Sequence, residues 1–338
     1  MSTRSIARHF LLPLNPVYRL AIGFREMRFR LGWEQVHRLQ YPVISVGNLS
    51  TGGAGKTPFA IALARALKAR GFAVDVLSRG YGRRTTSPAR VDPEGSPTDF
   101  GDEPLLIARE AQVPVYVAAQ RYDAGVLAEA YHSQDSGPTL VHILDDAYQH
   151  RQLQRDINIL LLNKEDLCDR MLPAGNLREP LSALNRADVI AIPESDSDLE
   201  AELQGLAWKR PVWRLRRVMH VPRVDGTVLA FCGIARPEQF FAGLEAAGLR
   251  VAMRISFRDH HHFAPHDLER LQHAARSAGA AALVTTAKDQ VRLAQLVPPR
   301  PGDLPLVTAG LTIEIVDELA ALDWLWSRLR ATELRPSV

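Results

Sequence analysis

Lysine is scarce in this 338-residue sequence: only five of the 41 basic residues are lysines, at positions 56, 68, 164, 209 and 288. Cysteine is scarcer still, and two residues, Cys168 and Cys232, cannot make a disulfide framework. No apolar run approaches the about 18–20 residues that a membrane-spanning helix needs. Pro13 interrupts the first apolar run, which is unlike a secretory signal. We therefore expect a protein that stays inside the cell.

The length allows two domains of ordinary size, at about 100–200 residues each. Apolar residues make up 46% of the chain and charged residues 23%, which is typical of a globular protein. The net charge of +3 is unevenly spread: residues 1–40 hold seven arginines and two glutamates, whereas the rest is slightly acidic. Because the basic charge is local to one end, we expect no nucleic-acid partner.

Residues 1–40 mix arginine with apolar side chains. The spacing predicts a helix over about 17–38, with Tyr18, Ile22 and Phe29 recurring on one face. A basic amphipathic helix of this kind is typical of proteins that lie in a membrane interface. An ordinary docking helix with a solvated arginine face fits the pattern equally well.

From residue 41 the sequence alternates short β-branched runs with helical stretches. The patterns predict strands over 43–46, 73–77, 114–118, 140–144 and 157–162, and helices over 58–70, 102–112 and 121–131. Such alternation implies a parallel sheet with helices on both faces. We predict an α/β fold of the P-loop NTPase type for residues 41–208.

Residues 209–225 break this alternation, because arginines there alternate with apolar residues. We predict an extended linker, which leads to a second, smaller α/β domain over 226–338. Its expected elements are strands over 228–231, 249–255 and 281–285, helices over 237–246 and 265–278, and a strand and helix within 313–332. The final helix is free to pack on the first domain.

A glycine-rich loop joins the first predicted strand of the larger domain to its first helix. Glycines let backbone N–H groups surround phosphate oxygens, while Lys56 would reach the β- and γ-phosphates. The strict pattern has a glycine where Ser50 stands, but the strand–loop–helix setting is that of a phosphate loop. The predicted nucleotide-binding residues are Gly52, Gly53, Ala54, Gly55, Lys56, Thr57 and Pro58.

Two adjacent carboxylates, Asp145 and Asp146, follow the predicted strand over 140–144. One can hold Mg²⁺ or its water together with the Thr57 hydroxyl, and the other can orient the metal or a substrate. Thr57, Asp145 and Asp146 are therefore the predicted metal ligands. The combination predicts a protein that hydrolyses a nucleoside triphosphate or transfers a group from it.

Asn163-Lys164-Glu165-Asp166 matches the guanine-recognition pattern N-K-x-D and raises the alternative of a GTPase or ATPase acting as a switch or chaperone. The double aspartate does not continue as D-x-x-G, however, and lies too close to Asn163 for the intervening elements. A non-enzymatic, membrane-associated binding module is a further alternative. We interpret Asn163 and Lys164 as a loop at a strand end.

Two further clusters carry charge at the ends of predicted strands or helices. Ser78–Arg83 offers Arg79 and Arg83 beside glycines, which suits an anionic substrate. Asp99–Pro104 opens a helix and could hold a carboxylate near an acceptor hydroxyl, as a kinase needs, although helix capping is an equally simple reading.

Taken together, the motifs resemble the tetraacyldisaccharide 4'-kinase family, which phosphorylates the 4'-hydroxyl of the lipid A disaccharide precursor with ATP. The resemblance extends from about residue 42 to 295 and rests on motifs that occur in order: Gly52–Pro58, Ser78–Arg83, Gly101–Pro104, Asp145–His150, Leu172–Pro180, Phe231–Pro237, Asp259–Phe263 and Val284–Asp289. The chain departs from the family in having Ala54, Ala147-Tyr148 and Ala287 where Thr, Gly-Phe and Glu are usual.

The resemblance implies site residues. Asp102 matches the catalytic carboxylate and His260 the histidine that tunes it, although His261 remains open for that role. Asp145 and Asp146 belong with the catalytic groups as well as with the metal. A metal site made by His260–His262 is a weaker alternative, because three consecutive side chains converge poorly on one ion. The expected substrate-binding residues are Arg79, Tyr81, Arg83, Glu103, Arg121, Gln149, His150, Asn176 and Arg178.

The implied partners are ATP, Mg²⁺ and a lipid disaccharide 1-phosphate that lies in a bilayer. An enzyme that acts on this substrate must reach the membrane surface, which favours the interfacial interpretation of residues 1–40. We expect a monomeric peripheral protein on the cytoplasmic face of the inner membrane.

Overall fold

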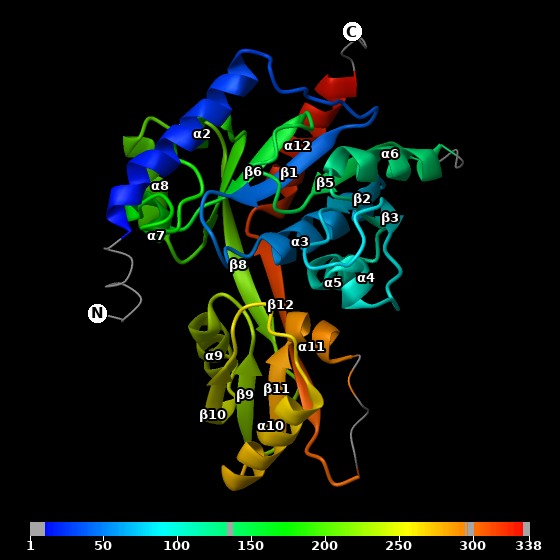
Figure 1. The fold of residues 1–338 in the computed structure, drawn as a ribbon, viewed down its shortest axis with the longest axis vertical. Helices are drawn as coiled ribbons and strands as arrows, with labels where there is room; N and C mark the ends of the chain where they lie inside the picture. The colour runs from blue at the N-terminus through cyan, green and yellow to red at the C-terminus, as the bar shows by residue number, and fades with distance from the viewer. Residues whose placement is uncertain (1–10, 134–137, 295, 297–300, 334–338) are drawn as a thin grey trace.

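This computed structural model describes residues 11–133, 138–294, 296 and 301–333. Within them, a single twelve-stranded sheet extends through the whole molecule (Figure 1). Its strand order is β10-β9-β11-β12-β8-β7-β6-β1-β5-β2-β4-β3. The first seven strands are β1 Val43–Asn48, β2 Ala73–Ser78, β3 Ala89–Arg90, β4 Val115–Val117, β5 Leu140–Leu144, β6 Ile157–Leu161 and β7 Val189–Pro193. The other five are β8 Val212–His220, β9 Thr227–Cys232, β10 Arg250–Ser256, β11 Ala282–Thr286 and β12 Leu306–Ile315.

The helices lie along both faces of this sheet (Figure 1). Those before β8 are the 3-10 helices η1 Leu12–Leu14 and η2 Leu181–Arg186 and the α-helices α2 Asn15–Arg30, α3 Lys56–Ala69, α4 Pro97–Phe100, α5 Asp102–Ala111, α6 Arg121–His132, α7 Lys164–Cys168 and α8 Ser197–Gly205. Those after it are α9 Pro237–Ala246, α10 Pro265–Ser277, α11 Ala287–Leu293 and α12 Glu318–Glu333. The predicted α/β fold with a mostly parallel sheet is confirmed.

The two lobes of Figure 1 are joined by strands of the same sheet. We call β1–β7 and their helices the first lobe, and β9–β11 with α9–α11 the second lobe. The expected linker over 209–225 contains β8, which pairs in parallel with β7 and antiparallel with β12. Its alternating residues explain this, because Trp213 and Leu215 are buried while Arg214 and Arg216 face solvent. Residues 212–220 are therefore a strand that carries the sheet from one lobe into the other.

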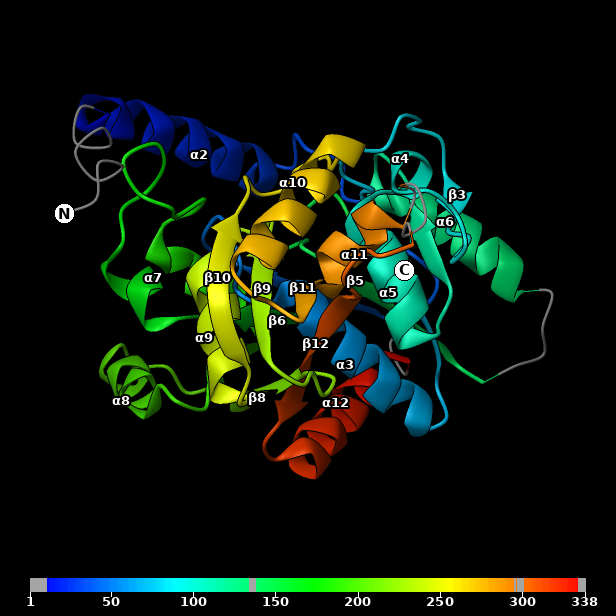
Figure 2. The same cartoon turned by 90° about the horizontal axis from the view of Figure 1, so that it is seen from below.

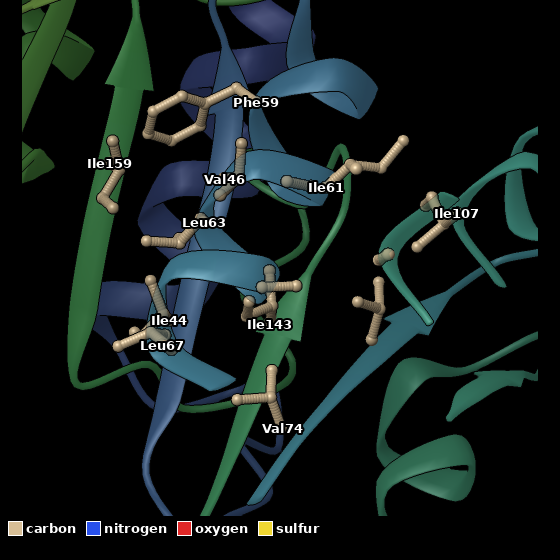
Figure 3. Close-up of a cluster of buried hydrophobic side chains, with 14 of the residues drawn as sticks. Ile44, Val46, Phe59, Ile61, Leu63, Leu67, Val74, Ile107, Ile143 and Ile159 are labelled. Atoms are coloured by element: carbon tan, nitrogen blue, oxygen red, sulfur yellow. The ribbon is translucent and has the colours of Figure 1, made fainter. Parts of the chain in front are cut away.

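The core of the first lobe forms between α3 and the strands beneath it (Figure 3). Phe59, Leu63 and Leu67 recur at helical spacing and are almost fully buried. They pack in one cluster with Ile44 and Val46 of β1. Burying each of these large side chains contributes about 1.5–3 kcal/mol, so α3 and the loop before it are held firmly on the sheet.

The last helix, α12, also packs on the first lobe although it follows the second lobe in sequence. Leu325 and Leu329 belong to the same buried cluster as α3. The ring of Trp326 lies 4.9 Å from that of Phe72, and Arg70 pairs with Asp323 at 2.9 Å. The chain thus returns to the first lobe after building the second.

Helix α2 ends earlier than the sequence pattern suggested. It stops at Arg30, and Gly32 follows with a left-handed φ of 69°, whereas the predicted helix ran to about residue 38. None of its residues is buried. Among the described residues, no helix is both long and apolar enough to cross a membrane.

His142, in the middle of β5, is a fully buried ionisable residue of the first lobe. Its Nδ1 lies 2.8 Å from Asp75 Oδ1 on β2, and its Nε2 lies 3.4 Å from Glu129 Oε1 on α6. Burial favours the neutral imidazole, but the two carboxylates outweigh it and raise the pKa of His142 to about 9. The protonated ring therefore ties α6 to the sheet.

We expect the stability of the protein to fall as the pH rises through the pKa of His142. A group with a raised pKa stabilises the fold only while it is protonated, so this contribution of ~3 kcal/mol is complete below pH 6.5 and lost above about 9. Urea denaturation of the wild type and of His142→Gln at about pH 6 and about pH 10 tests this. The free-energy difference between the two proteins should shrink at high pH; an equal difference at both pH values contradicts the prediction.

Candidate functional site

A cavity of about 1640 Å³ lies where the two lobes face each other. Its walls come from the predicted phosphate loop and the double aspartate on the first lobe, and from segments 234–236, 259–260 and 286–288 on the second. Helix α2 contributes Tyr18, Ile22 and Arg25. The cavity therefore joins the basic N-terminal helix, the phosphate loop and the second lobe.

The phosphate loop has the conformation that its glycines permit. Gly52 and Gly55 adopt left-handed φ angles of 93° and 81°, and α3 begins at Lys56 directly after them. The Lys56 ammonium donates to Asn48 Oδ1 at 3.1 Å and lies 3.6 Å from Asp146 Oδ1. All seven predicted loop residues, 52–58, line the cavity. A helix N-terminus with an adjacent lysine is a site for phosphate groups.

Asp145 directly follows β5, and its buried side chain lies next to Thr57 of the phosphate loop. The Thr57 hydroxyl donates to Asp145 Oδ2 at 3.3 Å, while Oδ1 is buried and has no hydrogen-bond partner. Burial, together with the charges of Glu103 and Asp146, raises the pKa of Asp145 to about 7. A buried oxygen without a partner is a place where a cation could bind.

Asp146 differs from its neighbour because cations surround it. Its backbone adopts a left-handed φ of 46°, and Arg178 donates to its Oδ1 at 3.1 Å. Burial alone would raise the pKa of Asp146, but the charges of Lys56 and Arg178 hold it below its ordinary value. Adjacent aspartates thus have opposite pKa shifts, set by their different neighbours.

Asp102 meets His260 across the two lobes. His260 Nδ1 lies 3.1 Å from Asp102 Oδ2, and both Nε (2.8 Å) and an NH2 group of Arg292 donate to the same oxygen. Burial raises the pKa of Asp102, but the hydrogen bond from His260 and the charges of Lys288 and Arg292 outweigh it and hold the pKa well below its usual range. The carboxylate is therefore ionised and held in a fixed orientation.

The two histidines that the sequence left open are separated by the structure. His260, with a left-handed φ of 59°, faces Asp102 and lines the cavity. His261 instead contacts Asp267 Oδ2 at 3.0 Å, at the start of α10. His260 is therefore the one placed against Asp102.

Most of the expected substrate-binding residues lie together. The cavity is lined by Arg79, Tyr81, Glu103, Arg121, Gln149, His150 and Arg178. Arg121 is buried and donates to the backbone oxygens of Asp145 and Asp146 at 3.1 and 2.8 Å. Burial and the charges of Arg121 and Arg79 lower the pKa of His150 to about 4, so His150 is neutral at pH 7.

Three predicted residues are absent from the described lining of the cavity. Asn176 accepts from the Thr51 N–H at 2.8 Å through its backbone oxygen, and its side-chain amide donates to Asp169, so it holds the residue that precedes the phosphate loop. Arg83 lies against Gly80 instead of pointing into the cavity. Asp102 is covered, whereas its neighbours His260, Glu103 and Lys288 line the cavity.

Comparison with known proteins gives the site a family. The model of the Tetraacyldisaccharide-1-P 4'-kinase family matches residues 7–330. The chain belongs to this family. A tetraacyldisaccharide 4'-kinase of Koribacter versatilis is 41% identical over 322 residues, covering 92% of this chain and 96% of that protein. The protein of the same name from Chromobacterium violaceum is 36% identical, and the match covers 95% of this chain and 93% of that protein.

A solved structure agrees with this assignment. LpxK from Aquifex aeolicus, crystallised in complex with ATP, superposes with a TM-score of 0.72 at 32% identity and covers 96% of this chain and 99% of that one. The resemblance predicted from the motifs to the tetraacyldisaccharide 4'-kinase family is confirmed.

The structure bears on two alternatives that the sequence raised, the guanine-recognition motif and the three-histidine metal site. Asn163 and Asp166 cap α7, with Asp166 Oδ2 accepting from the Asn163 N–H at 3.0 Å, so they serve the helix and not a guanine base. The three-histidine metal site is wrong for the part of the chain that the structure describes, where no group of three or more His, Cys, Asp or Glu side chains could hold a metal.

Two residues of this kinase site were missed by the motif analysis. Lys288 donates to Glu103 Oε1 at 2.8 Å and lies 3.3 Å from His260 Nε2, and Arg292 binds Asp102. Lys288 could have been noticed, because it is one of only five lysines and lies inside a quoted motif. Arg292 follows it by one turn of α11 and donates to Asp102 at the start of α5, and the two helices lie side by side in Figure 2.

The close approach of β1 to the aspartate loop generates a prediction. A Cβ at Gly47 would lie 2.6 Å from Tyr148 Cβ and 2.8 Å from its backbone N, and backbone cannot move aside cheaply. We expect Gly47→Ala to displace the aspartates from the phosphate loop, lowering stability by about 1–3 kcal/mol and weakening ATP binding at least about tenfold. Thermal unfolding and calorimetric titration with ATP measure both effects.

Gly205→Ala, at the end of α8, is the matched control, since a Cβ there would have no neighbour within 4 Å. An undisturbed ATP affinity in Gly47→Ala would show that the two loops do not depend on this contact.

Proposed function

We propose that this chain transfers the γ-phosphoryl group of ATP to the 4'-hydroxyl of a tetraacylated glucosamine disaccharide 1-phosphate, a step of lipid A biosynthesis. The observation that carries the proposal is that His260, bound to Asp102, lines the same cavity as Lys56 of the phosphate loop. Nucleotide and acceptor can therefore be brought together in a single site. All of these groups belong to a single chain, so a monomer is sufficient for the reaction.

The residues suit phosphoryl transfer by positioning and charge. Charge spreads over the γ-phosphoryl oxygens in the transition state, and Lys56 and Arg178, which both line the cavity, would supply the positive charge that stabilises it. Asp102 is ionised and oriented, so it can accept a hydrogen bond from the acceptor hydroxyl once the lobes have admitted it. His260 fixes the direction of that carboxylate.

The residues around Asp145 fit the binding of Mg²⁺. Asp145 Oδ1 is buried without a hydrogen-bond partner, and the Thr57 hydroxyl lies on the other oxygen of the same carboxylate. Asp146, the next residue in the chain, would supply the second carboxylate. Mg²⁺ in such sites is held by one or two carboxylates and by substrate phosphates, which agrees with so small a set of protein ligands. When bound, the ion neutralises charge on the β- and γ-phosphates.

Helix α2 supports a peripheral position on the cytoplasmic face of the inner membrane. The exposed apolar residues of α2 and of the two residues that cap it recur at intervals of three and four and so form one stripe: Leu14, Val17, Leu20, Phe24, Met27 and Leu31. On another side of the helix, the Tyr18 hydroxyl donates to the Arg178 backbone oxygen at 3.0 Å and Arg25 pairs with Glu179. The helix is thus attached to the site while an apolar stripe stays free for the bilayer.

We expect Asp102→Asn to lower turnover at least about 100-fold while changing the KM for ATP little, because the carboxylate serves the acceptor and not the nucleotide. The assay follows γ-labelled phosphate from ATP onto a lipid A disaccharide 1-phosphate in detergent with Mg²⁺. Absence of label on the lipid with the wild type would refute the proposed activity. Near-normal turnover of the variant would refute only the role of Asp102.

We expect Leu20→Ser/Phe24→Ser to weaken binding to anionic vesicles at least about tenfold, since the two exposed side chains would each bury apolar area in the interface. These residues are 73% and 55% exposed. Sedimentation with vesicles measures binding, and Val126→Ser, an exposed apolar residue on α6, is the control. Activity on detergent-solubilised substrate should be unchanged. Equal sedimentation of variant and wild type would contradict the membrane role of the stripe.

A further inference from the structure

Arg292 lies buried between two carboxylates that come from different lobes. Its Nε and one NH2 group donate to Asp102 Oδ2 on α5, and its NH1 group donates to Asp289 Oδ1 at 2.8 Å on its own helix, α11. The side chain of Arg292 is only 6% exposed and that of Asp102 only 8%. Figures 1 and 2 both show α11 beside α5, so this contact is a direct bridge from the second lobe to the first.

Contacts within the second lobe hold the Arg292 side chain in the orientation in which it meets Asp102 of the first lobe. Its NH1 group also donates to the Gly233 backbone oxygen at 2.9 Å, at the end of β9. Asp289 is fully buried and is itself held by the Thr286 hydroxyl at 2.7 Å and by the Gly233 N–H at 3.0 Å. Because the guanidinium is planar, anchoring NH1 fixes the direction in which the remaining donors point. They point at Asp102.

Both oxygens of Asp102 are consequently occupied in a defined way. Oδ2 receives Arg292 and His260, and Oδ1 receives the Glu103 N–H at 3.1 Å. Lys288 braces the same group from outside, because it contacts both Glu103 and His260 Nε2. A carboxylate so held cannot rotate, and a buried carboxylate without its cation would tend to take up a proton instead.

We propose that Arg292 is a positioning residue for phosphoryl transfer, which holds Asp102 in its working orientation and makes that orientation depend on contact between the lobes. The inference rests on the proposed function, since it concerns the carboxylate that is proposed to accept a hydrogen bond from the acceptor hydroxyl. Arg292 itself touches neither the phosphate loop nor the cavity wall. It acts through Asp102, to whose Oδ2 it donates alongside His260.

The experiment compares Arg292→Met, which keeps length and removes the charge, with Arg292→Lys, which keeps the charge. We expect Arg292→Met to lower kcat at least about 30-fold and to leave the KM for ATP within about twofold of the wild-type value. Arg292→Lys should recover about a third or more of the kcat that Arg292→Met loses. Arg254→Met is the control, because Arg254 forms an exposed pair with Glu245 on the second lobe. Calorimetric ATP binding and thermal unfolding establish that each variant is folded.

A double-variant cycle separates positioning from a merely structural ion pair. If Arg292 acts through Asp102, Arg292→Met should cost less than about threefold in kcat when added to Asp102→Asn. Losses that multiply, a rise in the KM for ATP equal to the fall in kcat, or no rescue by lysine in a folded variant would each overturn the proposal. If Asp102→Asn alone retains turnover, the proposed role of Asp102 fails instead, which distinguishes the two failures.

Discussion

The parallel pairing of β1 with β5 is the constraint on which the site depends. It brings the carboxyl ends of two strands together, so that the phosphate loop after β1 and the double aspartate after β5 leave the sheet side by side. Gly47 permits the contact, because any side chain there would strike the backbone of Tyr148. Lys56 then contacts Asp146, and Thr57 contacts Asp145, at this edge of the sheet.

The second requirement is that the other lobe reaches the same point, and a continuous sheet achieves this. β8 and β12 pair over residues 215–220 and 310–315; β8 leads from the first lobe to the second, and β12 leads back. Because α12 then returns to pack in the core beside α3, both ends of this crossing are anchored in the first lobe. His260 and Arg292 can therefore meet Asp102 without a flexible connection having to be ordered first.

The local parts of this arrangement could be predicted from the sequence. Lys56, Thr57 and the two aspartates lie in segments whose glycine content and position after a strand carry the signal. Arg292 could not be found in this way, since its partner Asp102 is 190 positions away and no short pattern links them. Asn176 was expected to bind the substrate, but its backbone oxygen instead accepts a hydrogen bond from Thr51. A motif of side chains does not predict such backbone contacts.

The strand β8 shows a related limit. Its alternation of arginine with apolar residues correctly indicated extended chain, yet whether extended chain is a linker or a strand depends on neighbours that are distant in sequence. Helix α2 shows the opposite case, because its apolar residues continue past Gly32 and only the turn at that glycine ends it. The sequence pattern indicates the local conformational preference of a segment, whereas its neighbours in the fold determine which element it forms.

Charge balance around Asp102 bears on how the kinase works. Three basic side chains hold the carboxylate ionised at any ordinary pH, which makes it a weak base. A weak base still suits a loose phosphoryl-transfer transition state, in which the attacking hydroxyl has gained little bond order and has no early need to lose its proton. In the role proposed for Asp102, the reaction needs the carboxylate in a fixed direction, and two donors from the second lobe hold it in one. The energy of the ion pair is thereby used for orientation.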